Sequence, residues 1–266
     1  VLIDVTKETE MDKIRGHFIS NVSHELRTPV TVLRSYIDTL YNFGNEFDFN
    51  TQKEFIGVMN QEIIRLNRLV NDILDFSRLE SLNVKLEKRK DNIVSIIENC
   101  VNSMQVLAQE RNLTFSIMKE PELPEVMFNE GSIERALKNL LSNAIKYSPD
   151  NGRIKIRIER ARMGEFIEIS IEDQGSGISE EYQGKIFDRF FRIENDTHTI
   201  KGTGLGLHLV KIAIEKHHQG QVFVQSRLNE GSTFGFRLPI NPSVEDIKGQ
   251  NNNQNDIEED YEHPPI

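Results

Sequence analysis

A histidine and a glutamate stand side by side in the stretch FISNVSHELRTPV, residues 18–30. A neutral histidine ring is a nitrogen nucleophile near pH 7, and the carboxylate of Glu25 can take or orient the ring proton of His24. His24 lies two residues after Val22, about 200° further round a helix, so we expect it to face away from the apolar side. Thr28 shares the face of His24. A zinc site of the H-E-x-x-H type is excluded, because position 28 is not histidine.

A second candidate site begins in the segment NLLSNAIKY, residues 139–147. Asn139 and Asn143 are four residues apart and therefore share one face of a predicted helix, with Lys146 and Tyr147 just beyond them. An amide oxygen is a suitable ligand for Mg²⁺, and a lysine can meet a phosphate as a point charge. Taken alone, the segment also fits a solvated helix face.

The segment DQGSGI places Asp173 at the end of a predicted strand, before Gly175, Gly177 and Ile178. A carboxylate there can accept a hydrogen bond from an exocyclic amine such as that of adenine. The glycines let the backbone turn tightly and approach a ring closely. A plain turn at the end of a strand is the alternative.

Three glycines, Gly202, Gly204 and Gly206, lead directly into a predicted helix in KGTGLGL. Glycine-rich backbone at a helix N-terminus favours anions. The spacing fits neither the dinucleotide-binding fingerprint nor the P-loop, so it predicts a phosphate-binding lid of another kind or a flexible linker. In the preceding IFDRFFR, residues 186–192, we expect Phe187, Phe190 and Phe191 to pack against the domain and anchor the lid. Arg189 and Arg192 could reach phosphate, and a core helix turn with surface arginines is the alternative for Arg189.

The elements that must position these residues fall into two regions. In the first, apolar residues recur every three or four positions from Ile14 to Leu40 and again from Phe55 to Phe76, which predicts a helical hairpin. In TQKE, Thr51 is expected to cap the second helix and Glu54 to reach back. One hairpin buries both stripes poorly, so we expect a dimer that forms a four-helix bundle.

The second region predicts an α/β sandwich, so the fold class is α+β. Helices are expected at 93–112, 132–148 and 205–218, and strands at 113–118, 153–160, 166–173, 221–227 and 232–240. They would form a mixed sheet covered by helices on one face. The predicted organisation begins with the end of an upstream sensor region at 1–10, where a strand is followed by a helix. The hairpin (11–80), a linker or short strand (81–92), the sandwich (93–240) and a disordered acidic tail (241–266) follow.

Charge and composition exclude several classes. The formal net charge is −10, and the tail from Asn241 holds seven acidic residues and one lysine, so nothing favours nucleic-acid binding. A single cysteine, Cys100, excludes a disulfide framework and a multi-cysteine metal site, and is expected to be buried. No apolar run is long enough to cross a bilayer. The chain begins with Val1, so we expect it to be cut from a longer protein with a membrane segment upstream.

Together these segments resemble the sensor histidine kinases of two-component signalling. HELRTP resembles the family's H box, NLLSNAIKY its N box, DQGSGI and GTGLGL its two glycine boxes, and IFDRFF its F box. All five occur in the family's order, and the resemblance covers about residues 11–240. The hairpin is most similar to cyanobacterial sensor kinases and their plastid-encoded relatives, and VLIDVTKETE (1–10) resembles the exit of a PAS sensor domain.

The resemblance implies a dimerisation and phosphotransfer hairpin followed by an ATP-binding domain of the histidine kinase and chaperone ATPase type. The γ-phosphoryl group of ATP would move to His24 and then to an aspartate of a response regulator. Glu25 would assist proton removal, and Thr28 would support dephosphorylation of the regulator. Asn143 would bind Mg²⁺. The implied ATP-binding residues are Asn139, Asn143, Lys146, Tyr147, Asp173, Gly175, Gly177, Ile178, Phe187, Phe190, Arg192, Gly202, Thr203, Gly204, Leu205, Gly206 and Leu207.

The resemblance also implies a homodimer that meets a receiver domain. It would contact a membrane only through an upstream segment, and this region would lie on the cytoplasmic or plastid stromal side. Two alternatives remain at this point. One is an ATPase of the related fold used by chaperones and DNA-repair proteins, although such an enzyme would lack the H box. The other is a degenerate kinase that acts as a scaffold, against which the intact Asn143, Asp173 and glycines argue.

Overall fold

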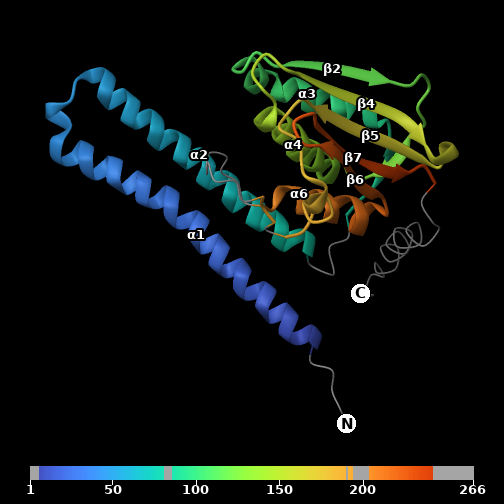
Figure 1. The fold of residues 1–266 in the computed structure, drawn as a ribbon, viewed down its shortest axis with the longest axis horizontal. Helices are drawn as coiled ribbons and strands as arrows, with labels where there is room; N and C mark the ends of the chain where they lie inside the picture. Colours follow the sequence, from blue (N-terminus) through green and yellow to red (C-terminus); the bar gives the residue numbers. More distant parts are fainter. Residues whose placement is uncertain (1–5, 81–85, 190, 194–203, 242–266) are drawn as a thin grey trace, which may run out of the picture. The chain divides into compact units, whose positions relative to one another are not determined.

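The computed structural model describes residues 6–80, 86–189, 191–193 and 204–241 (Figure 1). Its contacts divide the chain into two units, Val1–Lys85 with Glu180–Ile212 and Leu86–Ser179 with Ala213–Ile266. The strand expected at the start of the chain and the tail after residue 241 lie outside the described residues.

The helical hairpin predicted from the two apolar stripes is confirmed. Helix α1 (Thr6–Phe43) is joined through a short 3₁₀ turn, η1 (Gly44–Glu46), to α2 (Phe49–Glu80), and the two helices pack against each other (Figure 1). Near the turn, the ring of Phe55 meets the rings of Tyr36 and Phe47 edge-on, with centroids 5.1 and 5.2 Å apart. Helix α1 continues through Pro29, which is buried.

Much of the apolar surface of the hairpin stays exposed. Leu69 and Leu79 of α2 are buried. The exposed large apolar residues of the hairpin are Val30, Ile37, Tyr41, Phe43, Phe49, Ile56, Ile63, Ile64, Val70 and Leu74. So many exposed apolar residues on one hairpin favour an interface with another surface.

The start of α2 corrects one prediction. Helix α2 begins at Phe49, ahead of the proposed cap Thr51, and the backbone N–H of Thr51 donates to the carboxylate of Asp48 at 2.9 Å. Asp48 therefore caps the helix, because its charged oxygen is a better partner for the helix N-terminus than a hydroxyl. This hydrogen bond lowers the pKa of the exposed Asp48 carboxyl.

The remainder of the first unit holds two short helices, α5 (Glu180–Gln183) and α6 (Gly206–Lys211). The helix predicted over 205–218 is present, but it changes at Ile212–Lys216 into a π-helical turn, η3, in which the backbone is wider than in an α-helix. Such turns often lie near functional residues.

The second unit contains the predicted mixed sheet, with strand order β2-β4-β5-β7-β6. Its strands are β2 (Thr114–Lys119), β4 (Arg153–Ala161), β5 (Phe166–Asp173), β6 (Gln221–Arg227) and β7 (Gly231–Pro239). Strand β2 runs parallel to β4 and the other neighbours are antiparallel. A separate two-stranded ribbon pairs β1 (Arg89–Asp91) with β3 (Val126–Phe128), and a 3₁₀ turn, η2 (Arg162–Gly164), joins β4 to β5.

Helices α3 (Ile93–Gln109) and α4 (Glu130–Tyr147) cover one face of this sheet (Figure 1). The alternation of isoleucines with polar residues in the sequence explains why the helices pack on this face. Three alternate residues in each of β4 and β5 are isoleucines that are almost fully buried, for example Ile156 and Ile169. The residues between them face the other side, where Glu172 forms ion pairs with Lys155 and Arg157 at 2.7 Å. The α+β fold class is thus confirmed.

Candidate functional site

Helix α4 presents two asparagine amides that are available for a ligand. Asn139 and Asn143 are partly exposed, and neither makes a side-chain hydrogen bond with any residue that the structure describes. The start of the helix is fixed firmly. The side chain of Asn129 accepts the N–H of Ser132 at 2.9 Å, and the backbone N–H of Asn129 donates to Nε2 of the buried His218 at 2.9 Å. The two free amides therefore project from a well-anchored helix.

The C-terminal end of α4 is held by an arginine that the sequence reading did not single out. The guanidinium of Arg111 donates to the backbone carbonyls of Ile145, Lys146 and Ser148, and pairs with the Asp150 carboxylate at 2.8 Å. A cation at this end satisfies carbonyls that lack a helical partner. Arg111 thus fixes the turn that carries two of the predicted ATP-binding residues.

Lys146 and Tyr147 are those two residues. The ammonium group of Lys146 lies 5.1 Å from the centroid of the Tyr147 ring, and the tyrosine is exposed. This turn also meets the loop that follows β5. A Cβ atom on Gly175 would lie 2.7 Å from the carbonyl oxygen of Tyr147, so only glycine fits at this position without displacement.

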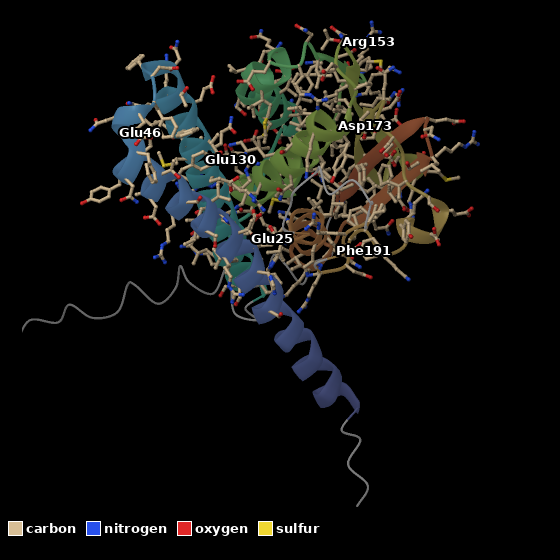
Figure 2. The ribbon with its side chains drawn as sticks, turned by 60° about the vertical axis from the view of Figure 1, so that its left-hand side comes forward. Glu25, Glu46, Glu130, Arg153, Asp173 and Phe191 are labelled. Carbon is tan, nitrogen blue, oxygen red and sulfur yellow. The ribbon has the colours of Figure 1, made fainter. Side chains whose placement is uncertain are left out.

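Asp173, the last residue of β5, is 5% exposed (Figure 2). One of its oxygens accepts the backbone N–H of Gly175 at 2.8 Å. Burial raises the pKa of Asp173 above its ordinary value, and the backbone N–H groups of Gly175 and Ser232 oppose that rise. A buried acceptor of this kind can bind an amine donor on a ligand, which would restore part of the lost solvation.

The glycine loop after Asp173 is pressed against the β6–β7 hairpin. Gly177 has a φ of +69°, and a Cβ there would lie 1.9 Å from the carbonyl oxygen of Arg227. The N–H of Ile178 donates to the hydroxyl of Ser226 at 2.8 Å, and the N–H of Asn229 donates to the carbonyl of Ser176 at 2.6 Å. In the second unit, α4 therefore carries the two asparagines, and the turn at its C-terminal end lies against the glycine segment that follows Asp173.

The first unit contains the histidine and its neighbours. His24 is exposed on α1, and its ring makes no hydrogen bond with a described residue. Glu25 is one residue further along (Figure 2), and its two oxygens pair with Arg65 of α2 at 2.9 Å and with Arg192 at 3.2 Å. The hydroxyl of Thr28 donates to the backbone carbonyl of His24 at 3.3 Å. The predicted nucleophile, base and threonine thus lie together.

The segment that was predicted to anchor a lid is also in this unit. Phe187 is buried, and its carbonyl lies 3.0 Å from Nδ1 of His208. The Nε–H of Arg189 donates to Nε2 of His208 at 3.1 Å, and the guanidinium lies 5.5 Å from the centroid of Phe76 on α2. An arginine only donates, so Nε2 of His208 accepts and Nδ1 carries the proton. Phe191 packs near Tyr182 of α5, with ring centroids 5.9 Å apart.

Of the second glycine segment, the described part begins at Gly204, which has a φ of +69°. Leu205 is buried, and Gly206 and Leu207 open α6. Phe190, Gly202 and Thr203, also predicted to contact ATP, lie outside the described residues.

In the parts that are described there is no cluster of three or more His, Cys, Asp or Glu side chains suited to a metal, and no helix is long and apolar enough to span a membrane.

Arg65 is the functional candidate that the sequence reading missed near His24. The turn of the hairpin is centred on Gly44–Glu46, and positions 25 and 65 lie equally far from it along the two helices. The loop predicted from the sequence, 42–50, is centred on 46, so counting outward from it would have reached position 67, close to Arg65 but not at it. For Arg111, no comparable spacing rule exists, because its partners are carbonyls of another helix.

Comparison with known families gives two matches. Residues 14–82 match the model of the His Kinase A (phospho-acceptor) domain. Residues 128–242 match the model of the histidine kinase-, DNA gyrase B- and HSP90-like ATPase. The first range contains His24, and the second contains the asparagines of α4 and both glycine segments.

Two curated relatives cover most of the chain. Drug sensory protein A of Synechocystis is 39% identical over 249 residues, which are 91% of this chain and 37% of the relative. A sensor-like histidine kinase named ycf26 from Pyropia yezoensis is 39% identical over 248 residues, 89% of this chain and 38% of the relative. The chain thus spans less than two-fifths of the length of these relatives.

A solved structure is similar to most of this chain. Histidine kinase ThkA, in a complex with response regulator protein TrrA, is 28% identical with a TM-score of 0.72, and the match covers 90% of this chain and 66% of that chain.

Proposed function

Because the chain belongs to the sensor histidine kinases, we propose that it transfers the γ-phosphoryl group of ATP to His24 and then to an aspartate of a response regulator. The observation that carries this proposal is the exposed ring of His24 on α1, next to the Glu25 carboxylate. A nucleophile that faces outward can meet both a nucleotide and a receiver domain. The solved complex of ThkA with TrrA supports a regulator as the second partner.

The transfer to histidine is a displacement at phosphorus. A ring nitrogen of neutral His24 forms the N–P bond, the bond between the γ-phosphorus and its bridging oxygen breaks, and ADP leaves with that electron pair. The proton on the other ring nitrogen becomes acidic as the ring turns positive. Glu25 accepts it and passes it to water. The phosphoramidate product retains a high transfer potential and serves as a relay.

The residues of the second unit supply the ATP site. Asp173 accepts a hydrogen bond from the adenine amine, and Gly175 and Gly177 let the backbone lie close to the base. Asn143 fits a Mg²⁺ ion, because its amide oxygen is a hard oxygen donor without a partner among the described residues. The ion would neutralise phosphate charge. Lys146 contributes a positive charge near the same end of α4.

The predicted dimer is part of the proposal. The exposed apolar residues of α1 and α2 leave each hairpin incomplete, and a second copy would cover them in a four-helix bundle. Light scattering of the chain should then give twice its mass. Replacing Ile63, an exposed residue of α2, with glutamate should shift the protein toward a monomer, whereas Arg34→Glu on the polar face of α1 should not.

The whole protein would be a membrane-associated sensor, with this region on the cytoplasmic or plastid stromal side. The relatives from Synechocystis and Pyropia yezoensis support a cyanobacterial or plastid setting. A PAS-like sensor region would precede the hairpin. Fractionation of source cells with an antibody to this region should place it in the membrane fraction.

Thr28 supports a second activity, removal of phosphate from the regulator. Its hydroxyl is exposed one turn after His24, where it can orient a water molecule toward a phosphoaspartate. Thr28→Ala should slow the dephosphorylation of a phosphorylated receiver domain and leave autophosphorylation in place. An unchanged dephosphorylation rate would remove this role from Thr28.

Labelling with γ-³²P-ATP tests the kinase proposal against an ATPase of the same fold. The kinase predicts a label on the protein that acid removes and base does not, and that is absent from His24→Gln. Release of phosphate without labelling of the protein would favour an ATPase. Failure to bind nucleotide in calorimetry would favour a scaffold.

A further inference from the structure

The carboxylate of Glu25 is held by two arginines from different parts of the first unit. Its Oε2 lies 2.9 Å from the guanidinium of Arg65, and its Oε1 lies 3.2 Å from that of Arg192. Arg65 also reaches the carboxylate of Glu62 on its own helix at 3.4 Å. Each oxygen of the predicted base therefore already accepts one arginine in this arrangement.

The two arginines differ in how firmly they are placed. Arg65 lies on α2 and is 23% exposed, and its contact with Glu62 keeps the guanidinium in position. Arg192 is 47% exposed and belongs to residues 191–193, which form neither helix nor strand. Of the two, Arg192 is the partner that can leave Glu25, whereas Arg65 stays with the hairpin.

This difference has a chemical consequence for proton transfer from His24. A carboxylate oxygen has two lone pairs, and it accepts a proton most readily when no guanidinium takes up one of them. Departure of Arg192 frees Oε1, while Arg65 retains Oε2 and so fixes the direction in which Oε1 points. Without Arg65, the long side chain of Glu25 would sample several rotamers, and productive orientations would become rare.

We propose that Arg65 is a positioning residue for Glu25 in the phosphorylation of His24. The proposal rests on the proposed function, since it assigns Arg65 to the same reaction. Arg65 touches neither ATP nor the transferred phosphoryl group in this role and acts only through the carboxylate.

The test is a double-mutant cycle on autophosphorylation, read as kcat and the KM for ATP. Arg65→Ala should lower kcat about tenfold, a part of the ~10²–10⁴ that a general base contributes, and leave the KM for ATP unchanged. Arg65→Lys, which keeps one donor and the charge, should recover part of the rate. The matched control is Arg68→Ala on the same helix, since Arg68 is exposed and forms no ion pair with a described residue.

The decisive comparison uses Glu25→Gln as the background. If Arg65 acts through Glu25, adding Arg65→Ala to Glu25→Gln should cause no further loss of kcat. A loss of the same factor in both backgrounds would show a structural role and overturn the proposal. An Arg65→Ala rate equal to that of the wild type would overturn it as well.

Two measurements distinguish a failure of this proposal from a loss of folding and from a failure of the proposed kinase function. Helical circular dichroism and the melting temperature of each variant report whether the hairpin is intact, and the Glu25→Gln background cancels a general loss of stability. An absence of phosphate on His24 in the wild-type protein would instead contradict the proposed kinase function itself.

Discussion

Gly177→Ala tests the geometry of the loop that follows Asp173. The backbone of Gly177 is left-handed, with φ +69°, and the added Cβ would lie 1.9 Å from the carbonyl oxygen of Arg227 and 2.6 Å from its carbon. These atoms belong to the backbone, so no side-chain rotation relieves the overlap. The loop must move away from the β6–β7 hairpin.

The cost has two parts. Placing alanine in a left-handed conformation costs roughly 1–2 kcal/mol. The overlap with a packed backbone adds about 1–3 kcal/mol, as in other overpacked sites. A total of ~2–5 kcal/mol, at ~2–4 °C per kcal/mol for a domain of this size, lowers the melting temperature by roughly 4–20 °C.

The assay is thermal unfolding followed by circular dichroism, together with calorimetric titration of ATP at a temperature where the variant is folded. The control is Gly131→Ala in the first turn of α4, where an added Cβ meets only the side chain of Asn129 at 3.8 Å. That variant should melt at or above the wild-type temperature. Gly177→Ala should melt lower and lose ATP affinity. A melting temperature and affinity equal to those of the wild type would refute the loop geometry.

Three further predictions concern Asp173, Cys100 and Arg111. Burial raises the pKa of Asp173, which means that the ionised form is disfavoured in the folded state, and stability decreases as pH rises through that pKa. Asp173→Asn should therefore melt no lower than wild type at pH 7 while calorimetry shows ATP binding weakened by about tenfold or more, and a lower melting temperature would contradict this account. Burial likewise raises the pKa of Cys100 to about 11, so iodoacetamide at pH 8 should alkylate it only after denaturant is added, as mass spectrometry can show. Arg111→Met should reduce the free energy of unfolding by about 1–3 kcal/mol in urea titration, since three backbone carbonyls lose a charged partner, and an unchanged value would remove the capping role.

Short-range patterns in the sequence predicted most of the elements. The alternating isoleucines of β4 and β5 placed both strands within one residue, because each faces a buried layer on one side only. The spacing of Asn139 and Asn143 placed both amides on one face of α4. The glycines after Asp173 predicted a tight turn, and Gly177 has a φ of +69° where the loop lies against the backbone of Arg227.

Features that depend on residues from other parts of the sequence could not be predicted from these short-range patterns. Thr51 was predicted to cap α2, but the helix begins two residues earlier, and the carboxylate of Asp48 accepts the backbone N–H of Thr51. The short strands β1 and β3 stabilise each other, and neither has a distinctive pattern of its own. Arg111 resembles any surface arginine until the end of α4 lies beside it.

The central claim is that His24 carries the phosphoryl group. The protein should be incubated with Mg²⁺ and ATP, digested under alkaline conditions that preserve phosphoramidates, and mapped by mass spectrometry. The account predicts a phosphoryl group on the peptide that contains His24, and none in His24→Gln. A phosphoryl group on another residue, with His24 unmodified, would contradict it.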